Sequence, residues 1–249
     1  MNRYTRFRSF KGGYAKLSEK AILVDTLISE IQKGNYKPND KLPSENELAD
    51  YYQVPRIVVR KAYERLQELG YIFSKQGKGS YVQNQKLQIP LILTGDVSFS
   101  EKMQELNYRF ETRNIACEEI AYDTSIFHAL NAGKNAVVYK ISRLRIVEDC
   151  PIAVHTSYLS QTVFANIKRE GSEISSIFQF FRKQGYSDFE ALKTKLTVIF
   201  PNKKERELLK CPSLVPLLSL ESGCIDRRTG QVLEYSKNIY RSDCFTYII

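Results

Sequence analysis

Two helical patterns in succession, separated by a proline, occupy residues 42–71 and constrain the fold more than any other feature of the chain. Ser44, followed three residues later by Glu47, is typical of a capping box, in which side chains and backbone N–H groups pair reciprocally at the start of a helix. Pro55 interrupts the pattern and is expected at the first position of the next helix, where its missing N–H has no intrahelical partner. Apolar residues then recur at helical spacing up to Gly70, so a second helix follows the first after a tight turn.

A third predicted helix and a hairpin frame this pair. The helix is expected over Leu17–Lys33, with Ser18 as its N-cap. After Gly70, the segment "YIFSKQGKGSYV" contains two short β-rich runs around a glycine-rich basic tip at Lys75–Gly79. Three helices followed by a hairpin predict a winged helix-turn-helix over residues 17–83; a helical bundle with a charged surface is the alternative.

Positive charge crowds the start of the helix that follows Pro55. Arg56, Arg60 and Lys61 lie there beside Ile57 and Val58, outside the apolar stripe and therefore facing solvent. The helix macrodipole is already positive at this end and favours acidic groups, so the pattern is unfavourable unless an external anion meets it. In a helix-turn-helix, the second helix places its N-terminal residues in the major groove of DNA, where arginine can contact guanine edges and lysine the phosphates. The pattern therefore predicts a DNA-contacting helix.

The net charge supports a nucleic-acid partner for the first third of the chain. The whole sequence carries +9, and residues 1–85 hold 15 Lys and Arg against 9 Asp and Glu. Such a concentrated excess is typical of a nucleic-acid-binding module, although a basic solvated face would explain the charge alone equally well. Residues 1–16 are rich in arginine and lysine without an acid, which predicts a flexible basic arm. Residues 84–90 are polar and end in a proline, as a linker would.

Residues 91–249 have a different sequence pattern, in which segments typical of β-strands predominate. Strands are expected in "AVVYKISRLRIVED" and "CPIAVHTSYL", joined by a turn at 148–151, and in "LKTKLTVIF", "PLLSLESGCID" and "QVLEYSKNIYR". Helices are expected over Ser100–Leu106, Ser175–Lys183 and Lys203–Lys210. The fold class is therefore α+β: an N-terminal winged helix-turn-helix joined to a C-terminal domain with an antiparallel sheet.

Several classes of protein are excluded by what the sequence lacks. The five cysteines are scattered and form no C-x-x-C pair, so neither a disulfide framework nor a zinc site is predicted, and a reducing cytoplasm is the expected location. No signal peptide and no apolar run approaching roughly 18 residues is present, so no membrane association is expected. His128 and His155 are isolated in the sequence, and no nucleophile–base pattern or phosphate-binding glycine loop accompanies them. No metal, cofactor or enzymatic activity is predicted.

The segment "LPSENELADYYQVPRIVVRKAYERLQELGYIFSKQGKGSYV" closely resembles the DNA-binding domain of GntR-family bacterial transcription regulators. The later segments "VSFSEKM", "ISRLRIVEDCPIAVHTSYL", "EISSIFQFF" and "EYSKNIYRSD" resemble the UTRA effector-binding domain of the HutC subfamily, which has a chorismate lyase-like fold. The resemblance implies a homodimeric regulator, expected to be a repressor, that binds a palindromic operator and releases it when a small metabolite binds residues 91–249.

The resemblance also implies which residues contact DNA. These are Ser44, Asn46, Arg56, Ile57, Val58, Arg60, Lys61, Lys75, Gln76, Gly77 and Lys78. Two positions depart from the family pattern: Asn46 replaces a frequent arginine, and Pro55 replaces a serine or threonine. Each change removes a hydrogen-bonding group that relatives use on DNA, so the operator sequence is expected to differ. An architectural DNA-binding protein without a ligand is an alternative.

An anion site is predicted in the second domain. Arg143 and Arg145 are two residues apart on one strand and so share a face, and Ser98 precedes a helix; arginines, hydroxyls and helix N-terminal amides together suit a phosphate or carboxylate. By resemblance, the effector-binding residues are Ser98, Phe99, Ser100, Arg143, Arg145, His155, Ser176, Phe178, Glu234 and Tyr240.

Two of these positions differ from relatives, because His155 stands where glutamate is common and Phe178 where some relatives have tyrosine. The alternatives are that the two arginines are surface charges and that His155 is a satisfied core histidine. The expected effector is a phosphorylated sugar, such as an amino-sugar phosphate or trehalose 6-phosphate, with a phosphonate or carboxylic acid as the alternative. A lyase-type enzyme fused to a DNA-binding module is a remote alternative.

Overall fold

The computed structural model describes residues 18–83, 89–90 and 98–246. These fall into two compact units: residues 18–83 with Pro212–Val215, and the rest of the described chain. Within the described residues, no helix is long and apolar enough to cross a membrane.

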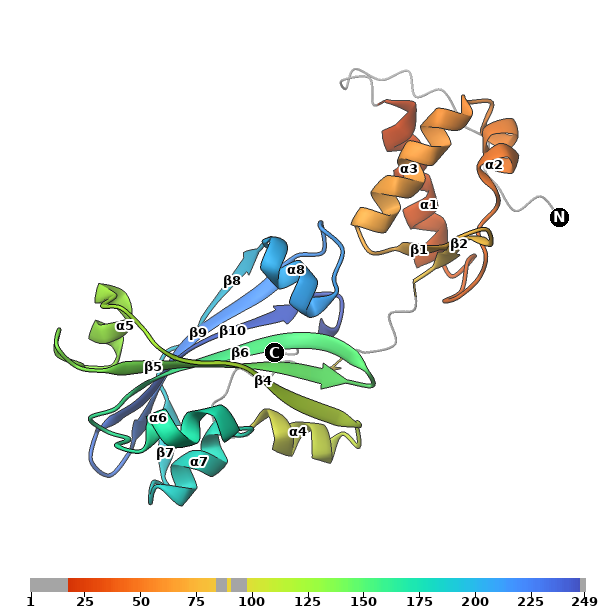
Figure 1. The fold of residues 1–249 in the computed structure, drawn as a ribbon. Helices are drawn as coiled ribbons and strands as arrows, with labels where there is room; N and C mark the ends of the chain where they lie inside the picture. The colour runs from red at the N-terminus through yellow and green to blue at the C-terminus, as the bar shows by residue number, and fades with distance from the viewer. Residues whose placement is uncertain (1–17, 84–88, 91–97, 247–249) are drawn as a thin grey trace. The chain divides into compact units, whose positions relative to one another are not determined.

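The first unit contains three helices and a hairpin (Figure 1). Its elements are α1 (Glu19–Gln32), α2 (Glu45–Tyr52), α3 (Arg56–Glu68), β1 (Ile72–Lys75) and β2 (Gly79–Val82). The Ser18 hydroxyl accepts a hydrogen bond from the N–H of Ala21, and Ser44 and Glu47 form the predicted capping box. The predicted winged helix-turn-helix is confirmed.

Pro55 corrects one detail of the sequence analysis. It is the N-cap of α3, with φ −59° and ψ 139°, and the helix begins at Arg56 rather than at the proline. The fixed φ of proline suits an N-cap as well as the first helical position, because an N-cap residue keeps an extended ψ. Gln53 stands before it in the left-handed region, with φ 56°, and this conformation ends α2.

A single apolar core holds the helices and the hairpin together. Leu23, Leu27, Leu48, Val59 and Leu66 are at most 1% exposed and belong to one cluster. The connector between α1 and α2 also pairs with β2, since the N–H of Leu42 donates to Ser80 and the N–H of Val82 donates to Asp40. The hairpin is therefore attached to the helical core by backbone hydrogen bonds.

The second unit is built on a twisted antiparallel sheet whose strand order is β4-β5-β6-β10-β9-β7, with β8 also pairing β9. The strands are β4 (Phe110–Glu119), β5 (Val138–Val147), β6 (Cys150–Ser160), β7 (Phe189–Ala191), β8 (Lys195–Ile199), β9 (Leu217–Asp226) and β10 (Val232–Arg241). Two shorter strands, β3 (Ile89–Pro90) and β11 (Phe245–Thr246), pair in parallel. The predicted α+β class and antiparallel sheet are confirmed.

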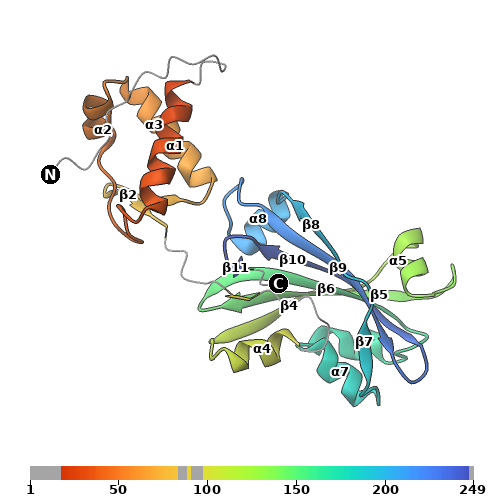
Figure 2. The same cartoon turned by 180° about the vertical axis from the view of Figure 1, so that it is seen from behind.

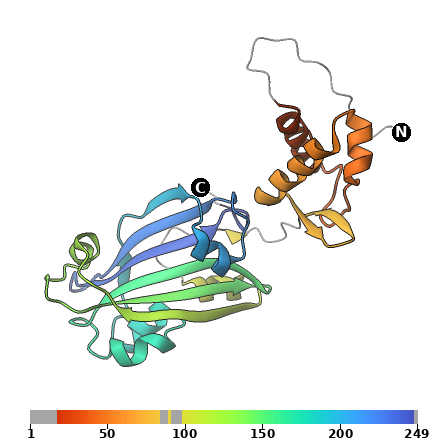
Figure 3. The same cartoon turned by 45° about the horizontal axis from the view of Figure 1, so that its top comes forward.

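Helices cover both faces of this sheet. Figures 1 and 2 show α4 (Phe99–Glu105) and α7 (Ile177–Lys183) on one face, together with the short helix α6 (Ile167–Glu170). Figure 3 shows α8 (Lys203–Leu209), in blue, lying across strands on the other face, where Leu209 packs with Leu144 and Val154. Alternate residues of β5 and β6 therefore point into two different cores.

Several elements escaped the sequence analysis. They are β4, the helix α5 (Thr124–Ala129), α6, a 3-10 turn over Gly171–Glu173, β7 and the β3–β11 pair. Strand β4 is an edge strand that pairs with β5 alone, and most of its side chains are exposed or half-buried. Its residues "FETRNIACEE" lack a strong apolar alternation, so pairing with β5 rather than local pattern determines the strand.

Candidate functional site

The N-terminal half of α3 presents a basic surface. Its first turn contains no acidic residue, and Arg56, Arg60 and Lys61 are exposed. The Nε of Arg56 donates to Glu45 at 2.8 Å, and the Nε of Arg60 lies 3.7 Å from Glu64. Exposed ion pairs of this kind contribute little to stability, so a phosphate or a base edge can replace either carboxylate at small cost.

The apolar residues predicted beside these charges are arranged as expected. Ile57 is 43% exposed and Val58 is half-buried, whereas Val59 lies in the core. Asn46 is exposed on α2. Ser44 is exposed as well, but its hydroxyl already accepts the N–H of Glu47 within the capping box. Any contact of Ser44 with DNA would therefore be additional to a structural role.

The hairpin tip carries the remaining predicted DNA contacts. Gln76, Gly77 and Lys78 are exposed, and Gly77 has a φ of 70°, a conformation that side chains other than that of glycine rarely adopt. The ammonium of Lys75 lies 4.9 Å from the ring centre of Tyr81, a cation–π contact that holds this lysine against the hairpin. The tip thus offers two exposed polar side chains around a glycine.

In the second unit, the strand register aligns the predicted effector residues on one face. Arg143 of β5 is paired with His155 of β6, which is paired with Asn238 of β10. Two residues further along β5, Arg145 is paired with Ala153, which is paired with Tyr240. The alternative that the two arginines are surface charges is wrong, because both are at most 3% exposed.

A cavity of about 160 Å³ adjoins this face. Seven of the predicted residues line it: Ser98, Phe99, Arg143, His155, Phe178, Glu234 and Tyr240. Among the described residues, Ser100, Arg145 and Ser176 are not part of its lining. The sheet supplies Arg143, His155 and Glu234, while α4 supplies Phe99 and a second cation, Lys102, and α7 supplies Phe178.

Arg143 is the principal charge of the cavity and is incompletely paired. One terminal nitrogen donates to the hydroxyl of Ser157, but Nε and the other terminal nitrogen have no partner among the described residues. Burial lowers the pKa of this guanidinium, and the nearby Glu234 opposes that effect. A buried donor without a partner is costly, so the site favours a ligand that accepts hydrogen bonds and carries negative charge.

Arg145 has a different environment from Arg143. A terminal nitrogen donates to the hydroxyl of Thr112 at 2.6 Å and to the carbonyl of Ser175 at 2.9 Å. Its guanidinium lies 5.0 Å from the ring centre of Phe99. Arg145 therefore connects β4, the residue before the N-cap of α7, and the aromatic wall of the cavity, and its charge adds to the positive potential beside Arg143.

Burial disfavours the charged forms of the remaining titratable groups. Burial raises the pKa of Glu234, opposed by the charge of Arg143 and a hydrogen bond from Ser157. Burial, with Arg145 and Arg143 adding to it, holds the pKa of His155 well below its usual range, so the imidazole is neutral. Its ring makes edge contacts with Phe99 and Tyr240, and its Nε2 has no hydrogen-bond partner among the described residues.

Two serines predicted in this site cap helices. Ser98 forms a capping box with Glu101 at the start of α4, and Ser176 accepts the N–H of Gln179 at the start of α7. Glu101 also accepts a hydrogen bond from Arg182 at 2.9 Å, which links the two helices. These serines hold the helices that carry Phe99 and Phe178, and Ser98 in addition lines the cavity.

Sequence reasoning missed several polar residues of the cavity. Ser236 and Asn238 line it, between Glu234 and Tyr240 on β10, and Ser157 lies behind them, fully buried. The signal was present in the sequence, because every second residue from Glu234 to Tyr240 is polar or a tyrosine. On a buried strand, such an alternation indicates a polar internal surface.

Comparison with known proteins gives both units a family. Residues 20–82 match the domain described as "Bacterial regulatory proteins, gntR family", and residues 105–246 match the UTRA domain. The chain is 30% identical to the uncharacterized HTH-type transcriptional regulator YurK of Bacillus subtilis over 190 residues, 76% of this chain and 77% of that one. It is 24% identical to the HTH-type transcriptional repressor NagR of the same organism, over 91% of each chain.

A solved structure shows the same fold. The crystal structure of PhnF from Mycobacterium smegmatis superimposes with a TM-score of 0.59 at 20% identity, covering 91% of this chain and 98% of PhnF. The named relatives are transcription regulators rather than enzymes, which contradicts the lyase alternative. The chain therefore belongs to the gntR family of bacterial regulatory proteins, as a DNA-binding transcription regulator with a UTRA domain.

Proposed function

We propose that this regulator is a repressor that dissociates from its DNA operator when a small anionic sugar binds next to Arg143. The observation that carries the proposal is the fully buried guanidinium of Arg143, which lines a cavity while two of its nitrogens have no partner in the described part of the chain. In this proposal residues 17–83 bind the operator, residues 84–90 link the domains and residues 91–249 bind the effector.

The cavity suits a molecule that is anionic at one end and rich in hydroxyls elsewhere. Arg143 can donate to a phosphate or carboxylate, while Glu234, Asn238 and the neutral His155 offer hydrogen bonds to hydroxyl or amino groups. A cavity of about 150 Å³ accommodates a molecule of the size of benzene. The cavity of about 160 Å³ is therefore small, and between the two candidates it favours a monosaccharide phosphate over the larger disaccharide trehalose 6-phosphate.

A carboxylic acid is the second candidate, because a specific observation favours it. One relative, 24% identical over 91% of this chain, is named the mannosyl-D-glycerate transport/metabolism system repressor MngR of Escherichia coli. Its name refers to a sugar derivative that carries a carboxylate. Arginine can hold a carboxylate in the same bidentate manner as a phosphate, so the cavity chemistry accommodates both.

DNA binding by a homodimer at a palindromic operator is part of the proposal. Strand β8 and the residue that follows it offer a surface for a second copy: Leu196, Val198 and Phe200 occupy every second position and are 39%, 66% and 64% exposed. Apolar side chains gathered in this way are typical of protein–protein interfaces. A two-fold dimer would present two α3 helices to two half-sites of opposite orientation.

The effector class is tested by titrating the full-length protein with hexose 6-phosphates, amino-sugar 6-phosphates, trehalose 6-phosphate, hexuronic acids, phosphonates and the matching uncharged sugars. Thermal shift identifies the binders, because a ligand of the folded state raises the melting temperature by mass action. A gel shift with an operator selected from random DNA then tests release. The proposal predicts binding and release by a charged monosaccharide but not by its uncharged form. Equal responses to both would contradict it.

A further inference from the structure

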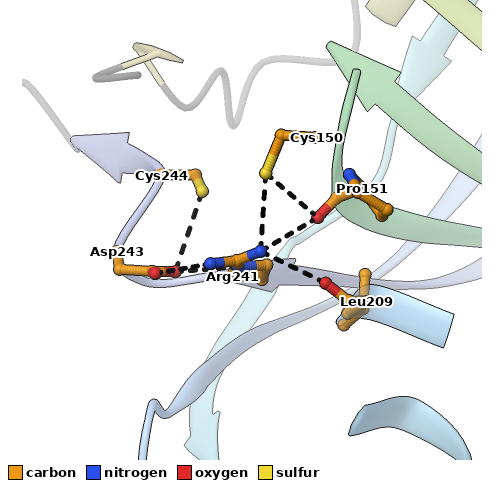
Figure 4. Close-up of polar contacts among 6 residues, drawn as sticks. All are labelled: Cys150, Pro151, Leu209, Arg241, Asp243 and Cys244. Atoms are coloured by element: carbon orange, nitrogen blue, oxygen red, sulfur yellow. Dashed lines mark hydrogen bonds and ion pairs between the residues drawn. The ribbon is translucent and has the colours of Figure 1, made fainter. Parts of the chain in front are cut away.

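A cluster of two cysteines, an arginine and an aspartate lies apart from the cavity's charged groups, at one end of the sheet (Figure 4). Cys150 opens β6, Arg241 ends β10, and Asp243 and Cys244 stand between β10 and β11. The guanidinium of Arg241 makes a bidentate pair with Asp243, at 3.1 and 2.7 Å. In this thiol cluster Arg241 and Cys244 are buried, at 7% and 5% exposed, whereas Cys150 and Asp243 are half-buried.

The third nitrogen of Arg241 faces Cys150. It lies 3.5 Å from the Cys150 sulfur and also donates to the carbonyls of Pro151 and Leu209, at 3.4 and 3.2 Å. If Arg241 had only a structural role, Asp243 and the two carbonyls would be sufficient hydrogen-bond acceptors for its guanidinium. The additional contact with sulfur places a positive charge beside a half-buried thiol, and this is the environment in which a thiolate is stabilised.

Cys150 differs in this respect from the other cysteines of the chain. The interaction with Cys244 lowers the pKa of Cys150, and the charges of Arg241 and Lys210 add to this effect. Burial and the negative charge of Asp243 oppose it without reversing it. Burial raises the pKa of Cys117, Cys211 and Cys224. Cys117 is as half-buried as Cys150, so accessibility alone does not distinguish the two.

Cys244 provides a second thiol within the same cluster. The interaction with Cys150 raises the pKa of Cys244, and burial adds to this effect, so Cys150 is the thiol of the two that loses its proton more readily. The Cys244 sulfur also lies 3.7 Å from a carboxylate oxygen of Asp243. Figure 4 shows both sulfur atoms on the same side of the Arg241–Asp243 pair.

We propose that Cys150 is a peroxide-reactive thiolate and that Cys244 is its resolving thiol, so that oxidation closes a disulfide between the start of β6 and the β10–β11 connection. The Cys150 sulfur attacks one oxygen of hydrogen peroxide, the O–O bond breaks, and the departing hydroxide takes up a proton to become water. Sulfur loses two electrons and becomes a sulfenic acid. The neighbouring negative charge that raised the pKa of Cys244 is then gone.

The second step uses the thiol already in place. Cys244 attacks the Cys150 sulfur, the S–O bond breaks, and the leaving hydroxide takes the Cys244 proton to form a second water molecule. One peroxide and two thiols thus give one disulfide and two waters. The disulfide forms next to a wall of the cavity, because the Cys244 carbonyl accepts the N–H of Ile89 at 3.0 Å, and both Ile89 and Phe245 line the cavity.

The experiment exposes the full-length, reduced protein to hydrogen peroxide and follows its intact mass. A loss of two hydrogen atoms that dithiothreitol reverses is expected, with peptide mapping that joins Cys150 to Cys244. In Cys244→Ser, which retains a hydrogen-bond donor, the sulfenic acid persists at Cys150 and is trapped by dimedone. Cys150→Ser abolishes both products, whereas Cys117→Ser and Cys211→Ser leave them unchanged.

A second measurement needs no variant. The rate of alkylation by iodoacetamide at pH 7 is expected to be about tenfold or more higher at Cys150 than at the equally half-buried Cys117, with its half-maximal rate at a lower pH. Equal rates at the two cysteines, or a disulfide that joins any other pair in the folded protein, would overturn the proposal. Neither measurement involves effector or DNA, so the result is independent of the proposed function.

Discussion

Arg143 and Glu234 are joined through a single hydroxyl, that of Ser157. The guanidinium donates to Ser157 from β5, and Ser157 in turn hydrogen-bonds the Glu234 carboxyl on β10. This bridge keeps the two opposite charges close while leaving two nitrogens of Arg143 without a partner among the described residues. An anion that enters the cavity would therefore find a positioned donor, and this relationship leads to the first prediction.

Arg143→Ala is expected to abolish the effector response while leaving the operator affinity of the effector-free protein nearly intact. A hydrogen bond to a charged group contributes about 1.5–3 kcal/mol, so the loss of two should weaken effector binding by roughly a hundredfold or more. Isothermal titration and a gel shift with and without effector measure the two quantities. Arg113→Ala, which removes an exposed arginine of β4, is the matched control. A variant that still responds normally would place the anion elsewhere.

A second prediction concerns α3. Arg60→Ala should weaken binding to the cognate operator and relax its specificity, by about 1–3 kcal/mol for one bidentate base contact. Arg65→Ala is the matched control, because Arg65 lies on the same helix near its C-terminal end and pairs with Glu68. Gel shifts with the cognate site and with a scrambled site give the ratio of the two affinities, which measures specificity. If Arg60→Ala and Arg65→Ala leave that ratio equally unchanged, Arg60 does not read bases.

The pH dependence of stability tests the environment of His155. Because its pKa is lowered in the folded state, the unfolded chain binds a proton that the folded chain rejects once the pH falls below about 6.5. The free energy of unfolding then decreases on acidification, by up to about 1.4 kcal/mol per pH unit, until the pH reaches the pKa of His155 in the folded state. Glu234 acts in the opposite direction, since its raised pKa lets the folded state bind a proton first.

His155→Gln should therefore remove part of the acid destabilisation between about pH 6.5 and 5. Urea denaturation, followed by hydrogen exchange in peptides of β6, compares this variant with the wild type at pH 7.5 and 5.5. His128→Gln serves as the control because His128 is exposed on α5. An identical pH dependence in wild type and His155→Gln would show that the imidazole is protonated in the folded chain.

The local parts of this fold could be predicted from the sequence, because caps and apolar spacing act within a few residues. Ser18 and Ser44 cap the helices that the sequence predicted them to cap, and Ser98 caps the helix that it was predicted to precede. The different environments of Arg143 and Arg145 could not be predicted, because the two residues have equivalent positions in the sequence pattern. What separates them is that Thr112, 33 residues from Arg145, accepts a hydrogen bond from that arginine alone. Among the described residues, Arg145 leaves its Nε without a partner, whereas Arg143 leaves two nitrogens without one.

Contacts between distant segments also explain what the sequence did not reveal about the thiol cluster. Cys150 and Cys244 are far apart in the chain and form no recognisable motif. They meet because β6 and β10 pair, which brings the start of one strand beside the end of the other. Whether a cysteine lies beside a guanidinium depends on that register, and a single sequence does not determine register between strands so far apart.

The last prediction concerns the exposed apolar face of β8. If Leu196, Val198 and Phe200 form the interface with a second copy, then Val198→Lys places a charge in a desolvated contact and should shift the protein from dimer to monomer. Operator affinity should fall with it, because two half-sites bound by one dimer act as one high-affinity site. Sedimentation velocity measures the first effect and a gel shift the second. Tyr122→Lys, at a side chain that is 48% exposed outside β8, is the matched control and should remain dimeric. A Val198→Lys protein that sediments as a dimer would place the interface on another surface, since a buried unpaired lysine could not be accommodated there without loss of association.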